Sequence, residues 1–263
     1  MKWFLILSAS MCWHFSNARI HDDTTAVNKL RNRITLQINR YPSLEISHQI
    51  GPYILESTTI SGFQVGYATL YKFNNKTGLF PEISTGISPY QNNFHIPENR
   101  SIAIGFREFI YETKIRDFWY LQFSIAGTYH ILVKNNQTIF FTVGLGIRRD
   151  RDLVYTNSAG YRYDFTSPRI TVFSLRTETS DEQRNMLTIP VGVYWEKPFA
   201  KRLFMSAGLR FTWLTRNFAT GNYVFFPGYV EESRGTVETG NYYLGIDFGF
   251  SWRKKERQQV PMH

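Results

Sequence analysis

The stretch from Tyr242 to Trp252, YYLGIDFGFSW, alternates strictly between large apolar side chains and small or polar ones. Successive side chains of an extended strand point to opposite faces, so this stretch predicts a β-strand with one apolar and one polar face. The apolar face carries Tyr242, Leu244, Ile246, Phe248, Phe250 and Trp252, and the other face carries Tyr243, Gly245, Asp247, Gly249 and Ser251. A strand of about 9–11 residues is long enough to cross a lipid bilayer when it is tilted.

The same alternation recurs along most of the chain. It is clear at Ile60–Phe73, Gly78–Ser88, Ile102–Tyr111, Phe118–Ile131, Thr138–Arg148, Leu187–Trp195 and Leu203–Leu214, and weaker at Asn32–Asn39, Leu44–Ile54 and Arg169–Arg176. The strong windows lack the 3.6-residue spacing of an amphipathic helix, so we expect very little helix. The expected fold is all-β: a closed antiparallel up-and-down transmembrane β-barrel of about ten strands, with eight to twelve possible.

The composition agrees with a barrel better than with a helical membrane protein. Aromatic residues make up 17% of the chain, yet the mean hydropathy is −0.30. A barrel with an apolar outside and a polar lumen reconciles the two values. The net charge is +9, but the basic residues are scattered except at Arg253, Lys254, Lys255 and Arg257, so we expect no nucleic-acid binding.

The first residues have the features of a secretory signal peptide. Lys2 precedes the apolar run Trp3–Phe15, and small residues at Ser16 and Ala18 suit a signal peptidase. We therefore expect a signal peptide at 1–18, a flexible lead at 19–31, the barrel at 32–253 and a basic tail at 254–263.

The only cysteine, Cys12, lies inside the predicted signal peptide. The mature chain would then contain no cysteine and no disulfide. Lipidation of Cys12 is the alternative, but the bulky Met11 before it does not suit a lipoprotein signal.

The connections differ in length. Short turns are expected at Asn74–Lys76, Lys114–Asp117 and Lys197–Lys201, and long polar loops at Pro89–Arg100, Arg149–Pro168 and Arg216–Thr239. Outer-membrane barrels combine short periplasmic turns with long outer loops. Strict alternation places Arg149–Pro168 on the side of the short turns unless the loop contains another strand, such as Tyr161–Phe165.

Two stretches resemble the outer membrane protein beta-barrel domain family of Gram-negative bacteria. GFQVGYATLYKFNNKTGLFPEIS (Gly62–Ser84) is similar to an early hairpin of that family, and MLTIPVGVYWEKPFAKRLFMSAGLRF (Met186–Phe211) to a later one. The resemblance implies an outer-membrane barrel and no single activity. Many such barrels end on an aromatic residue that the assembly machinery recognises, which Phe250 and Trp252 match, although Arg253–His263 continues beyond them.

Charged residues fall on the polar faces of the predicted strands. These are Glu82, Arg107, Arg148, Glu196, Arg210 and Asp247. We expect the three arginines to pair with the three acids inside a narrow barrel and to plug it. The alternative is that these charges line an ion-selective pore.

Aromatic residues fall near the ends of the predicted strands. Trp119, Trp195, Trp213, Tyr242 and Trp252 are expected to form the girdles that lie at membrane interfaces. His130 shares a polar face with Ser124 and Thr128 but has no acid at a neighbouring position. We therefore expect no catalytic, metal or cofactor site, and no enzyme.

The sequence thus favours an integral outer-membrane barrel with a structural, adhesive or narrow-pore role, whose loops form an interaction surface. Its expected partners are outer-membrane lipid and the outer-membrane assembly machinery; nothing in the sequence identifies a partner for the loops. The alternatives are a secreted soluble lipocalin-like barrel that binds an apolar ligand, and a lipid-modifying barrel enzyme. The polar face is rich in glycine and poor in lysine, which does not suit the surface of a soluble barrel.

Overall fold

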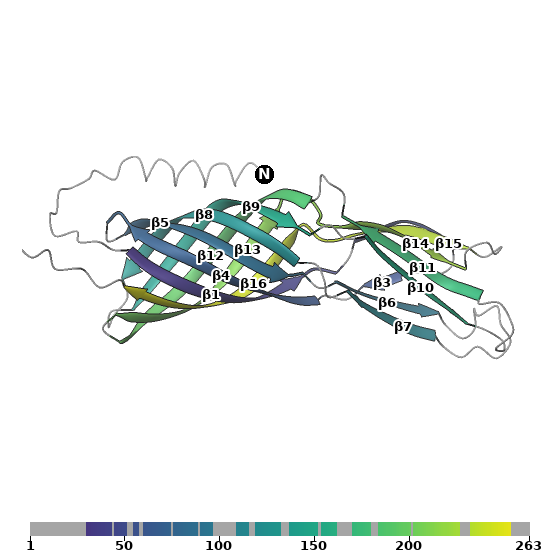
Figure 1. Ribbon diagram of the computed structural model, residues 1–263, viewed down its shortest axis with the longest axis horizontal. Helices are drawn as coiled ribbons and strands as arrows, with labels where there is room; N and C mark the ends of the chain where they lie inside the picture. The colour runs from purple at the N-terminus through teal and green to yellow at the C-terminus, as the bar shows by residue number, and fades with distance from the viewer. Residues whose placement is uncertain are drawn as a thin grey trace, which may run out of the picture.

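The described residues of the computed structural model form sixteen β-strands (Figure 1). The described residues are 30–43, 45–51, 55–57, 60–74, 76–88, 90–96, 109–115, 119–132, 137–151, 154–161, 170–179, 184–200, 202–226 and 232–253. Among them there is no helix long and apolar enough to cross a lipid bilayer.

Eight long strands close into an antiparallel barrel. They are β1 (Leu30–Tyr41), β4 (Ile60–Lys72), β5 (Thr77–Ile87), β8 (Trp119–Leu132), β9 (Thr138–Asp150), β12 (Asn185–Ala200), β13 (Leu203–Leu214) and β16 (Tyr242–Arg253). Their order around the barrel is β1-β16-β13-β12-β9-β8-β5-β4, and the first and last strands pair along their length from Arg31↔Arg253 to Arg40↔Leu244. Because strands that follow one another along the barrel wall are neighbours, the topology is up-and-down.

The other strands form two sheets beyond one end of the barrel (Figure 1). A five-stranded sheet has the order β10-β11-β14-β15-β2, and a three-stranded sheet the order β3-β6-β7. Their bounds are β2 (Glu45–Ile50), β3 (Leu55–Ser57), β6 (Tyr90–Ile96), β7 (Phe109–Ile115), β10 (Val154–Tyr161), β11 (Ile170–Glu178), β14 (Thr220–Phe225) and β15 (Ser233–Glu238).

The two sheets keep the cyclic order of the barrel strands from which they emerge. Continued as one cylinder, the barrel would give β2-β3-β6-β7-β10-β11-β14-β15, and the two sheets contain every ladder of that order except β2–β3 and β7–β10. At the first seam, His48 (φ 53°) and Gly51 (φ 100°) have left-handed backbone conformations that turn the chain at the end of β2. The extension is therefore a continuation of the barrel wall that has split into two sheets.

The barrel has eight strands, not the ten expected, which is within the range of eight to twelve. Two of the predicted strands belong to the extension: Leu44–Ile54 corresponds to β2 and Arg169–Arg176 to β11. Of the predicted strand Ile102–Tyr111, only the last three residues, from Phe109, are among the described residues, and they belong to β7. The segments that correspond to β2 and β11 lack the long run of outward aliphatic and aromatic side chains that the barrel strands share.

The expected turn at Lys114–Asp117 was wrong, because β7 ends at Ile115 in the three-stranded sheet, before the chain enters β8. Every long connection then lies at one end of the barrel, including 151–184, which contains β10 and β11. The predicted extra strand at Tyr161–Phe165 lies outside the described residues apart from Tyr161, the last residue of β10. β1 begins at Leu30, two residues inside the expected flexible lead.

The opposite end of the barrel has short turns. Between β4 and β5, the side-chain oxygen of Asn74 accepts hydrogen bonds from the backbone N–H groups of Lys76 and Thr77, both at 2.7 Å. An asparagine that bonds the backbone two and three residues on stabilises a tight turn, as the sequence predicted for this hairpin.

The outer face of the barrel is apolar at mid-height. Leu209, Ile246 and Phe248 are each about half exposed, at 50%, 49% and 48%. So much exposed aliphatic and aromatic surface around a closed wall is what contact with lipid requires. The outward set predicted for Tyr242–Trp252 is the set that faces outward in β16.

We expect a charge at mid-height on this face to destabilise the protein. Leu209→Arg should lower the free energy of unfolding by about 2–4 kcal/mol, whereas Leu30→Arg, at the end of β1, should cost about 0–1 kcal/mol, because the penalty for arginine falls towards the membrane interface. Urea titration of the protein in lipid vesicles measures both values. Equal costs for the two variants would show that this face does not lie in lipid.

Candidate functional site

The inside of the barrel is a row of buried polar side chains. All four acids of the barrel strands, Glu82, Asp150, Glu196 and Asp247, point inward and are at most 5% exposed. The arginines Arg31, Arg33, Arg148 and Arg210 point inward as well and are at most 7% exposed. Charges that lose contact with water are tolerated only when they are paired, so the contacts among these groups determine what the interior can do.

Two arginines and two acids meet near the middle of the barrel. A guanidinium nitrogen of Arg210 lies 2.8 Å from a carboxylate oxygen of Glu82 and 2.9 Å from one of Asp247. Arg33 donates a 2.7 Å hydrogen bond to the other carboxylate oxygen of Asp247. Thr35 donates to Glu82 at 3.2 Å. These groups join β1, β5, β13 and β16, so the cluster links strands from opposite parts of the wall.

Aromatic rings fill the space beside this cluster. Arg210 Nε donates a 2.8 Å hydrogen bond to the Tyr194 hydroxyl. The Tyr194 ring is stacked on Phe140, with centroids 4.8 Å apart and planes at 13°. The Arg33 guanidinium lies 4.9 Å from the Tyr194 centroid, a cation–π distance. Both rings are 1% exposed, which shows that the bore is occupied at this level.

A second ion pair lies towards the short turns. Arg31 donates a hydrogen bond to Glu196, and its guanidinium lies 3.8 Å from the centroid of the Phe204 ring. His130 is stacked on Phe140 at 5.1 Å, and its Nε2 lies 3.0 Å from the hydroxyl of Thr128. A small apolar cluster lies nearby and consists of Ala68, Leu70, Phe80 and Ala126.

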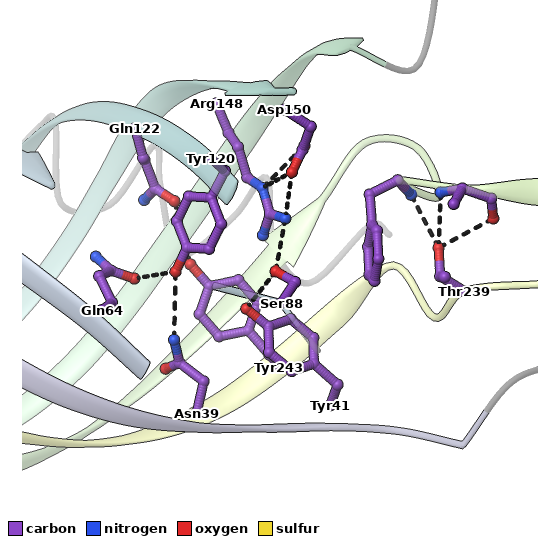
Figure 2. Close-up of polar contacts among 12 residues, drawn as sticks. Asn39, Tyr41, Gln64, Ser88, Tyr120, Gln122, Arg148, Asp150, Thr239 and Tyr243 are labelled. Atoms are coloured by element: carbon purple, nitrogen blue, oxygen red, sulfur yellow. Dashed lines mark hydrogen bonds and ion pairs between the residues drawn. The ribbon is translucent and has the colours of Figure 1, made fainter. Parts of the chain in front are cut away.

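A third charged group lies at the end of the barrel that carries the two sheets (Figure 2). Arg148 and Asp150, two residues apart on β9, form an ion pair in which Nε and one terminal nitrogen of Arg148 both donate to the carboxylate. The same terminal nitrogen donates to the Ser88 hydroxyl at 2.8 Å, and Ser88 donates to the Tyr41 hydroxyl at 2.9 Å. The chain of contacts therefore crosses the bore from β9 to β1.

Tyrosines and amides complete this level (Figure 2). The Tyr120 hydroxyl donates to Gln64 at 2.8 Å and accepts from Asn39 at 3.4 Å. The Tyr243 hydroxyl donates to Gln122 at 3.1 Å. Arg148 lies over the Tyr120 ring, 3.8 Å from its centroid. Each of these side chains is at most 2% exposed.

The segment between β13 and β14 covers this level of the bore on the side of the two sheets. The Thr239 hydroxyl accepts hydrogen bonds from the backbone N–H groups of Phe218 and Ala219, both at 3.0 Å (Figure 2). The Phe218 ring lies 6.0 Å from that of Tyr41 and 5.4 Å from the Arg148 guanidinium. Phe218 is 3% exposed, so it forms an apolar lid over the ion pair of Arg148.

Glycines on β16 make room for large polar side chains of β1. At Gly249 a Cβ atom would collide with the Arg33 guanidinium, and at Gly245 it would collide with the Gln37 amide. On β16, the small inward residues are therefore a consequence of large side chains on β1 that lie across the lumen side of that strand.

The structure brings together half of the six charges singled out in the sequence. Glu82, Arg210 and Asp247 share one cluster, whereas Arg148 pairs with Asp150 and Glu196 with Arg31. Arg107 lies outside the described residues.

Sequence reasoning missed Arg31, Arg33 and Asp150. The signal was present in the first two, because Arg31, Arg33, Thr35, Gln37 and Asn39 alternate with Asn32, Ile34, Leu36 and Ile38. Asp150 was missed because the predicted strand ended at Arg148, whereas β9 continues to Asp150.

The five aromatics singled out in the sequence lie on the outer face near the strand ends. Trp119, Trp213 and Tyr242 lie at the end nearer the two sheets, and Trp195 and Trp252 at the end with the short turns. Trp195 is 43% exposed, and its indole N–H donates to Gln137 at 3.0 Å. Tyr242 stacks on Phe211 at 5.6 Å, and Trp252 lies 6.5 Å from Tyr67. Aromatic side chains near both strand ends are what the girdles of a membrane barrel would require.

Within the part of the chain that the structure describes, no group of three or more His, Cys, Asp or Glu side chains could hold a metal ion.

No protein-family profile matches this chain, and no curated protein matches it in sequence. Solved structures do match. The outer membrane protein OprG from Pseudomonas aeruginosa is 10% identical over 86% of this chain and 96% of its own, with a TM-score of 0.45. Neisserial surface protein A is 9% identical over 86% and 97%, with a TM-score of 0.44. The attachment invasion locus protein of Yersinia pestis is 13% identical over 83% and 97%, with a TM-score of 0.30. These are small outer-membrane barrels.

Removal of one central arginine should test how much the interior contributes to stability. Arg210→Ala leaves Glu82 and Asp247 short of a buried partner and should cost about 3–5 kcal/mol of unfolding free energy. The control is Arg176→Ala on β11, where the ion pair with Glu178 is 3.5 Å long and both side chains are more than half exposed. That change should cost less than about 1 kcal/mol. Denaturant titration in detergent compares the two, and a cost for Arg210→Ala no larger than the control would contradict the paired interior.

Proposed function

We propose that this protein is an integral outer-membrane barrel with a closed interior, which anchors the two sheets outside the cell as an interaction surface. The observation that carries this proposal is the arrangement of the side chains: apolar groups face outward, paired charges fill the bore, and all the long connections build sheets at one end. The proposed role is structural or adhesive.

The filled bore argues against a pore. The central cluster of Arg33, Glu82, Arg210 and Asp247 crosses the lumen, and the level of Arg148 and Tyr120 closes it again nearer the sheets. An open channel would leave such side chains in contact with water, but each of these groups is at most 3% exposed. In an eight-stranded barrel the interior is just wide enough for side chains to fill it.

The direction of the apolar face argues against a lipocalin-like barrel. A soluble barrel that carries an apolar ligand would turn its aliphatic side chains inward. Here Ile34, Leu36 and Ile38 of β1 point outward, at 49%, 47% and 49% exposure, and Thr35, Gln37 and Asn39 point inward, at 1% or less. The interior therefore offers polar groups where an apolar ligand would need apolar ones.

We further propose that the protein is not an enzyme. His130 is 3% exposed, and its described contacts are the Thr128 hydroxyl and the Phe140 ring. A catalytic histidine needs a nucleophile or an acid within reach and access for a substrate. The buried position of His130 supports a structural role in the interior.

The five-stranded sheet provides the proposed interaction surface. One face is apolar and buried, with Phe173, Leu175, Tyr223 and Phe225 at 0% exposure and ring contacts between Phe173 and Phe225 at 5.1 Å. The other face is mostly polar; its exposed side chains include Thr156, Ser158, Arg176, Glu178, Asn222 and Arg234, together with the apolar Ile50 and Val154. Because the apolar face is covered, a partner of this sheet would meet the mixed-charge polar face or a strand edge.

Export and insertion complete the proposal. The predicted signal peptide at 1–18 would direct the chain out of the cytoplasm, and β16, with Phe250 and Trp252 near its end, would present the signal that the outer-membrane assembly machinery recognises. The last strand closes the barrel by pairing with β1.

Thiol labelling in intact cells tests the proposed orientation, because a chain cleaved at the predicted site would contain no cysteine. Asn222→Cys, on the exposed face of β14, should react with a membrane-impermeant maleimide, whereas the matched variant Lys76→Cys, in the turn after β4, should react only after the outer membrane is permeabilised. Labelling of residue 76 but not 222 in intact cells would overturn the orientation. Recovery of the mature protein as a soluble species without detergent would overturn the membrane barrel.

A further inference from the structure

The charges described on the outward side of the barrel wall are all basic. All four acids of the barrel strands point inward. The outward charged residues of these strands whose side chains are described are Arg40, Arg149 and Lys197, and Arg151 follows directly after β9. The rims of the outer face therefore carry positive charge that no acid of the barrel strands offsets on the same face.

Arg149 and Arg151 form a patch with two neighbours at the rim nearer the sheets. Arg149 is paired in register with Asn185 on β12 and Leu121 on β8. The backbone N–H of Arg151 donates to the Trp119 carbonyl at 2.9 Å, which places Trp119 directly beside it. Side chains two residues apart on a strand lie on the same face, separated by roughly 7 Å along it. Trp119, Arg149, Arg151 and Asn185 thus share one outward-facing area across three adjacent strands.

The two guanidinium groups of this patch differ from those inside the barrel. Arg31, Arg33, Arg148 and Arg210 each form an ion pair with an acid. Among the described residues, by contrast, no side chain forms an ion pair or a hydrogen bond with the guanidinium of Arg149 or Arg151. Both side chains are exposed, so their donors are available to a group from outside.

The aromatic band is interrupted at the same place. Near the end nearer the sheets, the outer faces of β4, β8, β13 and β16 carry Phe63, Trp119, Trp213 and Tyr242. β9 and β12 are the only two neighbouring strands of the barrel that both lack an outward aromatic residue near this end. Arg149 and Asn185 occupy the corresponding positions. Below them lies an aliphatic strip of Leu121, Ile147, Leu187 and Leu145, which are 53%, 55%, 56% and 68% exposed.

We propose that this patch binds the phosphate of a lipid headgroup in the membrane leaflet on the side of the two sheets. Guanidinium groups bind phosphate oxygens through paired, charge-assisted hydrogen bonds, and the Asn185 amide supplies a further donor. The acyl chain of the same lipid would lie along the strip of Leu121, Ile147, Leu187 and Leu145. A free anion would use the arginines but would have no reason to need that strip, which is why the proposal commits to a lipid. The inference rests on the membrane insertion of the barrel and not on what the two sheets bind.

Native mass spectrometry of the detergent-solubilised protein tests this proposal with two lipid probes. Phosphatidic acid, which has an exposed phosphate, should bind more tightly than phosphatidylcholine, in which a choline covers it. Arg149→Gln with Arg151→Gln should weaken the tightest phosphatidic acid binding at least tenfold, because it removes the charge-assisted hydrogen bonds to the phosphate. Arg149→Lys with Arg151→Lys should retain part of the affinity, since it keeps the charge but not the planar fork.

The matched control is Lys197→Gln with Arg202→Gln, which removes the same charge at the opposite rim and should leave the tightest binding unchanged. The shift in gel mobility on boiling shows for each variant that the barrel is folded. Equal losses in the control and in the arginine pair would overturn the site, since total charge would then explain the binding. Inorganic phosphate that displaces phosphatidic acid at equal concentration would show an anion site without lipid and would also overturn the proposal. A protein that fails to enter bilayers at all would instead contradict the proposed function.

Discussion

The need to pair charges inside a narrow barrel governs the structure. An isolated ion in a low-dielectric interior is strongly unfavourable, so each inward arginine needs an acid within a few ångströms. Arg33 and Arg210 share Asp247, Arg210 also reaches Glu82, Arg31 meets Glu196, and Arg148 meets Asp150. Replacement of such pairs by apolar residues often leaves stability unchanged or raises it. We therefore attribute the benefit of the ion pairs to the strand register that they help to fix. Shifting one strand by one residue would turn its polar face into lipid and its aliphatic face into the bore.

The two ends of the barrel differ in how the wall continues beyond the charged interior. At the short-turn end, Asn74 closes a tight hairpin by local hydrogen bonds, and the wall stops there. At the other end the chain continues from the barrel strands into the two sheets. The ring of Phe218, which lies over Arg148, separates the filled bore from these sheets. Beyond that ring, in the five-stranded sheet, the apolar side chains of Phe173, Leu175, Tyr223 and Phe225 are buried and the exposed side chains are mostly polar. The wall then splits where β2 turns away from β3 and where β7 does not pair with β10.

The barrel could be predicted from the sequence because most barrel strands present long, regular alternation; only β1 corresponds to one of the weaker windows, Asn32–Asn39. In β13 and β16 the inward and outward sets are those that the alternation predicts. The strand number was overestimated because alternation does not show which strands pair with each other. β2 and β11 are β-strands, but they pair within the five-stranded sheet and not within the barrel. The shortness of these segments and their lack of outward aliphatics were the available signals.

The sequence predicted that charges pair inside the barrel, but it identified only part of the residues and pairs. Of the charges that the sequence assigned to the lumen, three, Glu82, Arg210 and Asp247, do meet. The sequence does not show the stagger between strands, which decides that Glu196 faces Arg31 across 165 residues of chain. The pair of Arg148 and Asp150 is local and could have been found by extending β9 by two residues.

The central claim is that paired charges and stacked rings close the bore, and conductance across planar lipid bilayers tests it most directly. Purified, refolded protein should produce no stable open level in symmetric salt, while its heat-shifted gel mobility confirms that the barrel is folded. Steady, large single-channel steps that scale with the amount of folded protein would contradict the claim, because ions would then pass through the levels of Arg210 and Arg148.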